Sequence, residues 1–196
     1  MELSSLHWGY GWKTCCYIKC PANSGSNFYN YKNFFSIVLF AIVDADYKFV
    51  YVDVGKNGRI SDGGIFANTP IYTKLENNDL KLPTCEPLPD RVKQIPYVIV
   101  GDDAFPLKPY LMKPYPSRNL ELTQRVFNYR LSRVRRIVEN VFGILSSRFG
   151  VFQKPINHWN QKKLKKLCWH LVYILYFTIS SGLKLHLKTS MLRQSL

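Results

Sequence analysis

Two apolar runs near the start of the chain predict a β-hairpin. Residues 34–43 are almost continuously apolar, whereas valines alternate with Phe49, Tyr51 and Asp53 in residues 49–54. β-branched and aromatic residues favour strands, and a continuous apolar run is typical of a strand covered on both faces. Because the polar triplet at 44–46 separates the two runs, we expect a turn there.

A long helix is the strongest periodic signal in the chain. Between residues 122 and 148, apolar side chains recur every three or four positions. That spacing places them on one face of an α-helix and predicts that this face is buried. The stripe consists of Phe127, Leu131, Val134, Val138, Val141, Leu145 and Phe149.

The order of the predicted elements indicates an α/β fold. A strand near residues 15–21 precedes the hairpin, a short helix follows Ser61 and Asp62, and Pro70 limits that helix. A short apolar strand at 97–100 comes next, before the long helix. Strands interleaved with helices in this way predict a mixed sheet flanked by helices.

The charge of the chain is divided unevenly. Residues 1–103 contain 10 Lys and Arg against 11 Asp and Glu, whereas residues 104–196 contain 17 against 2, so the chain has a net charge of +14. A basic surface attracts the phosphate backbone of nucleic acids. The alternative is a solvated basic face without a ligand, and the total charge does not separate the two interpretations.

The apolar stretch at residues 167–179 is too short to span a membrane. It has 13 residues and includes His170, whereas a spanning helix needs about 20 apolar residues. We therefore expect a helix that is buried or faces a partner, and no membrane association. The five cysteines are odd in number and cluster at one end, which indicates a reducing compartment.

Asp102 and Glu139 are the acids whose positions suggest chemistry. Asp102 follows the predicted strand at 97–100, and Glu139 is the lone acid of the long helix, at the edge of its apolar stripe. Carboxylates on rigid elements can bind Mg²⁺ or Mn²⁺, which activate water for phosphodiester cleavage. The alternative for Glu139 is a surface ion pair with Arg135 or Arg136, worth only about 0.2–0.5 kcal/mol.

Three segments of the chain resemble the DDE nuclease domain of PIF/Harbinger transposases and of the host nuclease-like proteins derived from them. They are NSGSNFYNYKNFFSIVLFAIVDADYKFVYVDVGKNGRISDGGIF, LPDRVKQIPYVIVGDDAFPLKPYLMKPYP and RVFNYRLSRVRRIVENVFGILSSRFGVFQKPI. The resemblance covers residues 16–156. It implies a ribonuclease H-like mixed sheet flanked by helices, and divalent-metal-dependent strand cleavage and transfer on DNA.

The resemblance implies roles for particular residues. The second acid of the family, in a Gly-Asp pair after the fourth strand, matches Asp102, and the third, in the VENVFG helix, matches Glu139. Asp103 would tune the local field. Asp62, in SDGG, occupies a motif position, and there we favour helix capping over metal binding. The expected phosphate-binding residues are Lys113, Arg130, Arg133, Arg135 and Arg136.

The first acid of the family is absent from this chain. It belongs to an Asp-Gly-x-His phrase, and counting back from Cys20 and Pro21 leads to Trp-Lys-Thr-Cys at residues 12–15. We therefore expect that part of the first strand and the N-terminal helical region are missing. Two of three carboxylates would hold metal ions weakly. The alternative function is a catalytically inactive DNA- or protein-binding remnant.

The expected organisation is an N-terminally truncated DDE endonuclease-like domain at residues 1–156, followed by a basic, partly apolar helical tail at residues 157–196. The resemblance implies DNA and a Myb-like DNA-binding protein as partners, and a location in the nucleus and also in the cytoplasm. The KKLKK run at residues 162–166 fits nuclear import, phosphate contacts or a solvated charge cluster equally well.

Overall fold

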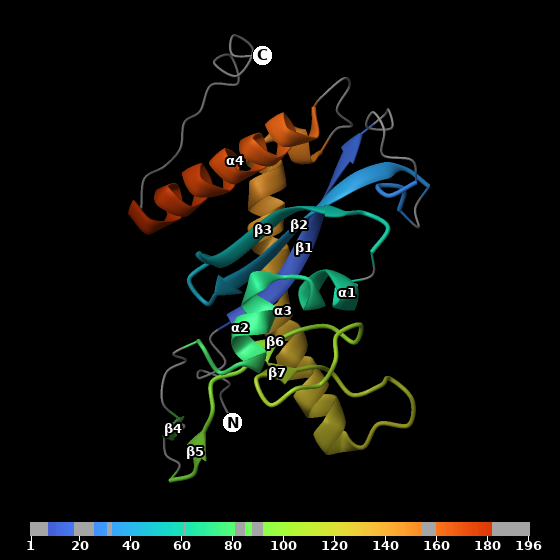
Figure 1. Cartoon of the computed structure of the whole chain (residues 1–196). Coiled ribbons are helices and arrows are strands. Elements are labelled where there is room, and N and C mark those ends of the chain that lie inside the picture. Colours follow the sequence, from blue (N-terminus) through green and yellow to red (C-terminus); the bar gives the residue numbers. More distant parts are fainter. Residues whose placement is uncertain are drawn as a thin grey trace.

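Helices cover both faces of a central sheet (Figure 1). The computed structural model describes residues 8–17, 26–30, 33–60, 62–80, 85–87, 92–153 and 160–181, with the backbone alone for 8–17, 62, 86 and 161. In chain order the elements are β1 (Trp8–Tyr17), β2 (Phe35–Asp44), β3 (Phe49–Asn57), α1 (Asp62–Ala67), α2 (Pro70–Glu76), β4 (Glu86–Pro87), β5 (Gln94–Ile95), β6 (Ile99–Val100), β7 (Leu111–Met112), α3 (Leu122–Arg148), η1 (Gly150–Phe152) and α4 (Gln161–Ser181).

The central sheet has five strands in the order β3-β2-β1-β6-β7. β2 runs antiparallel to β1 and β3, whereas β6 is parallel to β1, and β7 is parallel to β6. The predicted hairpin is confirmed as β2 and β3. Its turn is closed by Asp44, whose Oδ1 accepts the N–H groups of Asp46 and Lys48 at 2.9 and 2.8 Å. The sheet is therefore mixed, as the order of elements predicted.

β2 is buried on both faces because its side chains alternate between two hydrophobic cores. The odd-numbered residues from Ile37 to Val43 join a core with α3 and α4. The even-numbered residues from Val38 to Ile42 join a second core with α1 and α2. Successive side chains of a strand point to opposite faces, so a strand between two helical layers needs apolar residues throughout. This confirms the interpretation of the continuous apolar run.

The expectation that part of the first strand is missing stays a prediction, but β1 begins earlier than expected, at Trp8 rather than near residue 15. Its ten residues pair with β2 along the whole ladder, from Trp8 opposite Asp44 to Tyr17 opposite Phe35. The physical reason is that the buried strand β2 needs a hydrogen-bonding neighbour on this side for its N–H and C=O groups. The expected N-terminal helical region concerns residues outside the described ones.

α3 begins and ends where the apolar periodicity predicted. Within it Leu131, Val134, Val138, Val141 and Leu145 are all buried. Its N-terminal half packs on β6, and the helix also lies against β1 and β2. The helix runs beside β1 in the same direction (Figure 1). It therefore links the hairpin side of the sheet to the strand that precedes Asp102.

Two short helices, rather than one, follow β3. Pro70 starts α2, a position where its missing N–H leaves no hydrogen bond unmade. Thr69 caps this helix, because its Oγ1 accepts the N–H of Tyr72 at 3.3 Å. The prediction that Pro70 limits the first helix is therefore confirmed, and the same proline begins a second one.

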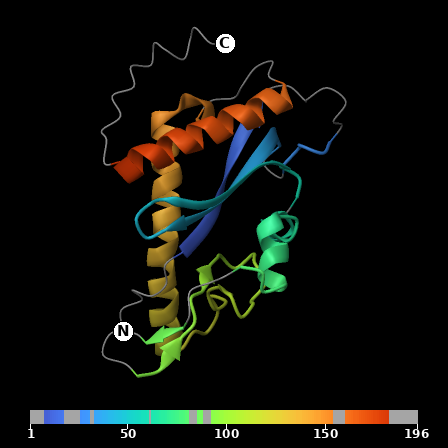
Figure 2. The same ribbon diagram turned by 60° about the vertical axis from the view of Figure 1, so that its left-hand side comes forward.

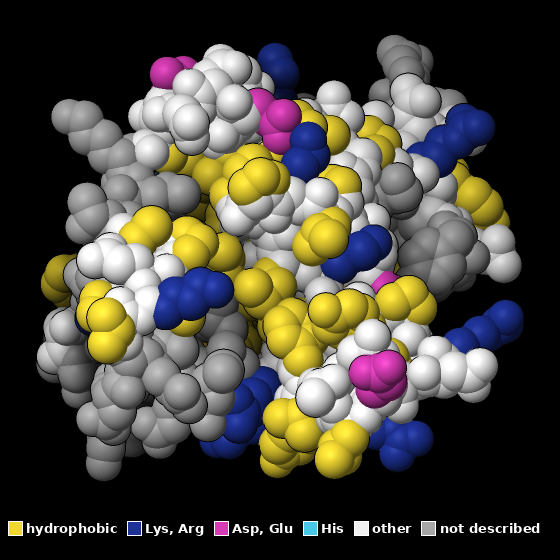
Figure 3. Space-filling view, turned by 90° about the horizontal axis from the view of Figure 1, so that it is seen from below, with side chains coloured by type: hydrophobic (Ala, Val, Ile, Leu, Met, Phe, Trp, Pro, Cys, Tyr) yellow, Lys and Arg dark blue, Asp and Glu magenta, His cyan; other side chains and the backbone are white. Residues whose placement is uncertain are grey.

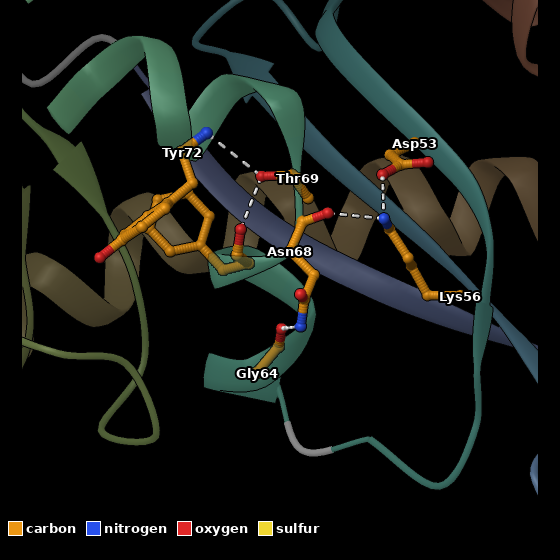
Figure 4. A network of polar contacts seen from close by, with 7 residues as sticks. Asp53, Lys56, Gly64, Asn68, Thr69 and Tyr72 are labelled. Carbon is orange, nitrogen blue, oxygen red and sulfur yellow. Dashed lines mark hydrogen bonds and ion pairs between the residues drawn. The ribbon is translucent and has the colours of Figure 1, made fainter. Parts of the chain in front are cut away.

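The turn between α1 and α2 is tied to the edge strand β3 (Figure 4). Lys56 donates from Nζ to the carbonyl of Asn68 at 2.7 Å and lies 3.3 Å from Oδ2 of Asp53. The amide of Asn68 donates in turn to the carbonyl of Gly64 at 2.7 Å. These contacts hold α1 against the sheet, close to the loop that follows β6.

α4 lies over the same face of the sheet as α3 (Figure 2). One side of the helix enters the shared core through Leu164, Cys168, Leu171, Val172 and Leu175. The apolar stretch is thus a packed helix, and among the described helices none is both long and apolar enough to cross a bilayer. The part of residues 157–196 that forms α4 therefore packs with residues of the 1–156 segment.

Candidate functional site

Asp102 lies just beyond the carboxyl end of β6, a strand that has a neighbour on each side in the sheet. β6 pairs in parallel with β1, with Val100 opposite Gly9. Continuing that register by two residues brings Asp102 level with Gly11 of β1. Val98 and Val100 face α3, where they pack with Leu131 and Val134. Asp102 thus follows a strand segment whose valines pack on the long helix α3.

The loop after β6 is held rigidly. Oδ1 of Asp102 accepts the N–H of Ala104 at 3.0 Å, which closes a turn. Phe105 is buried, and its ring meets that of Phe66 edge-on at a centroid distance of 5.9 Å. A Cβ added at Gly63, in α1, would lie 3.0 Å from the carbonyl oxygen of Ala104. The start of α1 therefore packs tightly against the loop that carries Asp102.

The carboxyl of Asp102 is half-buried, and its pKa is raised. Burial is the largest cause, and the neighbouring charge of Asp103 adds to it. The hydrogen bond from Ala104 and the charge of Arg135 lower the pKa but do not offset the burial. A carboxylate whose negative charge is not fully balanced by its neighbours favours a nearby cation.

Arg135 lies on a flank of α3 from which its charge acts on Asp102, and Glu139 follows it one turn along the helix. Arg135 is half-buried, and its charge acts on Asp102. Glu139 is exposed and lies four residues further on, so it occupies the same flank one turn along the helix. Among the described residues, no Lys, Arg or His forms an ion pair with Glu139. The predicted alternative of a surface ion pair with Arg135 or Arg136 is therefore not seen.

Lys113, one of the expected phosphate-binding residues, contacts the loop that carries Asp102 and Asp103. It follows β7, the strand next to β6. Its Nζ donates to the backbone carbonyl of Asp103 at 3.4 Å, and the carboxylate of Asp103 is exposed. The side chain of Lys113 is thus tied to the backbone of the loop that carries the two adjacent acids.

The predicted phosphate-binding arginines do not share one face of α3. Given 3.6 residues per turn, Arg130 lies on the flank opposite Arg135, while Arg133 and Arg136 are exposed and point away from the sheet. Figure 3 views the end of the molecule where α3 begins and shows Lys and Arg at separate places around hydrophobic side chains. The basic character of this helix is therefore spread over several directions.

Asp62 and residues 12–15 are placed by their backbones alone. Asp62 is the first residue of α1, which agrees with a position at the start of a helix. Trp12 pairs with Phe40 of β2, and the parallel register with β6 carries its backbone to the level of Asp103. Residue 12, to which the sequence resemblance assigned the missing first acid, is thus in β1, the strand next to β6, and it is a tryptophan.

Asp103 is the acid whose charge acts on Asp102, and the pairing of Asp102 with Glu139 at one metal ion stays a prediction. No group of three or more His, Cys, Asp or Glu side chains lies together within the described part of the chain. Sequence reasoning missed two supports of this site: Arg135 acting on Asp102, and Phe105 anchoring its loop. An aromatic residue five positions after the strand was a detectable signal for the anchoring role of Phe105. No local pattern revealed the effect of Arg135 on Asp102.

Comparisons with known proteins agree with the resemblance noted from the sequence. Residues 14–175 match a DDE superfamily endonuclease family. A stretch of 117 residues, 60% of this chain, is 32% identical to Protein ALP1-like of Arabidopsis thaliana and spans 29% of that relative's length. No solved structure matches the chain. Because the family match covers most of its residues and includes Asp102 and Glu139, the chain belongs to the DDE superfamily endonuclease family.

Proposed function

We propose that this chain is a nuclease domain of ribonuclease H-like fold that cleaves DNA phosphodiester bonds with a divalent cation. The observation that carries the proposal is the placement of Asp102. It follows β6, a strand parallel to both of its neighbours, its pKa is raised, and the charge of Arg135, one helical turn before Glu139, acts on it. A five-stranded sheet in the order β3-β2-β1-β6-β7 with β2 antiparallel to its neighbours supports the ribonuclease H-like fold.

The donor set fits one hard cation. Mg²⁺ is commonly held by one or two carboxylates, with waters and substrate phosphates completing its shell. Asp102 and Glu139 offer that number of oxygen ligands, and the raised pKa of Asp102 indicates a charge that a cation would balance. A clamp of two ions requires a further carboxylate, which the described residues do not supply.

Each residue of the site has a defined task in this proposal. Asp102 and Glu139 would hold Mg²⁺ or Mn²⁺, which when bound polarises the phosphate and lowers the pKa of a water molecule. Lys113 and Arg135 would contact phosphate oxygens and position the strand for in-line attack. Ala104 and Phe105 keep the loop of Asp102 in one conformation, so that the carboxylate is oriented before DNA binds.

The test is plasmid nicking in the presence of Mg²⁺ or Mn²⁺. Asp102→Asn and Glu139→Gln keep the size of each side chain and remove its charge, and we expect each to reduce cleavage about 100-fold or more. Asp46→Asn is the matched control, because this exposed acid lies in the hairpin turn. Equal nicking by the wild type and all three variants would remove the catalytic assignment.

A catalytically inactive DNA-binding module is the second candidate. It is favoured by the tryptophan at position 12, to which the sequence resemblance assigned the missing first acid, and by Arg135, whose charge already partly balances Asp102. In that case DNA binding persists without cleavage and is unchanged in Glu139→Gln. Lys113→Gln should then lower the salt dependence of duplex binding by about 0.9 in the log–log slope.

The remaining expectations concern partners and location. We propose DNA and a Myb-like DNA-binding protein as partners, with the chain in the nucleus, on the basis of the family alone. Co-purification of the full chain with a Myb-like protein, and loss of this co-purification when α3 arginines are replaced, would support the proposed protein partner. Recovery of a tagged chain only in a cytoplasmic fraction would contradict the proposed location in the nucleus.

A further inference from the structure

The two sides of α4 differ in chemistry. The inner side is aliphatic, with leucine, valine and cysteine buried in the core. The outer side carries large aromatic rings, and Trp169, Tyr173 and Phe177 remain 48%, 67% and 57% exposed. Of the ring–ring contacts between described residues, none involves these three side chains. Three large aromatic side chains left in solvent on one side of a helix indicate a binding function.

Lysines and aromatic rings form one continuous stripe along the helix. Lys162, Lys166, Trp169, Tyr173 and Phe177 are spaced by three or four residues, so they share one face. At a rise of 1.5 Å per residue, successive rings lie about 6 Å apart along the axis. That distance is close to two stacking intervals of about 3.4 Å. One base can therefore lie between neighbouring rings.

The charge of α4 is of one sign. The helix contains Lys162, Lys163, Lys165 and Lys166 and has no Asp or Glu. The lysines gather in its first two turns, where the helix dipole adds further positive potential. Such a surface attracts a polyanion and repels a second basic one.

We propose that the outer face of α4 binds single-stranded nucleic acid. The lysines bind phosphate groups, and exposed bases stack on Trp169, Tyr173 and Phe177. Stacking platforms beside a cationic track are the features by which proteins hold single strands without base specificity. A paired duplex hides its base faces and cannot use the rings, so the stripe prefers unpaired strands.

This surface is separate from the proposed nuclease site. α4 packs against β3, at one edge of the sheet, whereas Asp102 follows β6 near the other edge. The proposal therefore does not depend on metal binding or cleavage. A protein helix is a less suitable occupant, because the inner side of α4 shows that helix packing in this chain uses aliphatic residues. A second copy would bring like-charged lysines together unless the helices ran antiparallel.

The test measures binding of labelled oligothymidylate, oligouridylate and a DNA duplex to the full chain by fluorescence anisotropy, with chelator present. We expect both single strands to bind more tightly than the duplex. Comparing oligothymidylate with oligouridylate shows whether the stripe distinguishes DNA from RNA. Trp169→Ala, Tyr173→Ala and Phe177→Ala should each weaken single-strand binding about 5- to 150-fold, whereas Tyr173→Phe keeps the ring and the affinity.

Ile174→Ala is the matched control, since Ile174 is a partly exposed apolar residue of the same helix that lies off the stripe. It should leave the affinity for oligothymidylate unchanged. Single-strand affinity that is absent, or that survives all three ring variants, would overturn the proposal. Self-association of the wild type that the ring variants abolish, measured by sedimentation, would instead assign the stripe to a second copy of the chain. Circular dichroism checks that each variant folds.

Discussion

The positive charge of Arg135, on α3, acts on the half-buried carboxyl of Asp102, at the end of β6, and lowers its pKa. The two residues are 33 positions apart in the chain, yet packing of α3 on the sheet brings them together. Arg135 therefore sets part of the charge balance at the proposed metal site, in addition to any contact with phosphate.

Replacing Arg135 should raise the pKa of Asp102 further. In Arg135→Gln the favourable charge is lost while burial and the charge of Asp103 still act on the carboxyl. The measurement is a carbon-detected NMR titration of the Asp102 carboxyl. Arg136→Gln is the control, because its side chain is exposed and points away. Identical titration curves in both variants would contradict the assigned electrostatic interaction between Arg135 and Asp102.

Asp102→Asn should stabilise the folded protein at neutral pH. Folding raises the pKa of Asp102, so its protonated carboxyl favours the folded state. This contribution to the free energy of unfolding is fully present below the unfolded pKa of about 3.9. It is lost as the pH rises through the folded pKa. Asparagine carries no charge and can still accept the N–H of Ala104. The Tm difference from the wild type should be positive near neutral pH and shrink in acid. A variant less stable at neutral pH would reject this account.

Two glycine-to-alanine changes should have opposite effects. A Cβ at Gly58 would lie 2.1 Å from Oγ of Ser36 and 2.8 Å from its carbonyl oxygen. Gly58→Ala should therefore cost about 1–3 kcal/mol. Gly143, on α3, has no atom within 4 Å of an added Cβ, so Gly143→Ala should stabilise by about 0.5–1 kcal/mol. Urea unfolding of both variants measures the difference, and effects of the same sign would be inconsistent with this packing.

Leu145→Ala should destabilise the protein by about 2–5 kcal/mol. Leu145 is fully buried where α3 meets the hairpin and α4, so its removal leaves a cavity in the larger core. Val126→Ala, on the same helix but 42% exposed, should change stability by no more than about 0.5 kcal/mol. The comparison uses denaturant unfolding at one pH. A similar loss in both variants would argue against the burial of this face.

Local patterns were sufficient for the main elements of the fold. The long helix has the bounds that its apolar stripe predicted, and the hairpin strands follow the two apolar runs. These patterns work because the periods of helices and strands are properties of neighbouring residues. β1 was underestimated for a non-local reason, since its full length depends on pairing with β2.

The candidate site was only partly accessible to the same reasoning. Asp102 and Glu139 stood out because each is an acid in an otherwise apolar or basic element. The four arginines of α3 expected to bind phosphate point in different directions, and only the charge of Arg135 among them acts on Asp102. Side-chain direction depends on how the helix is rotated against the sheet, which the sequence of the helix alone does not set.

By itself the sequence determined the hairpin, the long helix, the two unusual acids and the family of this protein, since these are recorded in residue order and spacing. Only the tertiary structure decided that β6 lies parallel to β1, that the charge of Arg135 acts on Asp102, and that one side of α4 stays exposed. Each of these depends on contacts between residues far apart in the chain. Such contacts form through packing of complete elements, which no local pattern encodes.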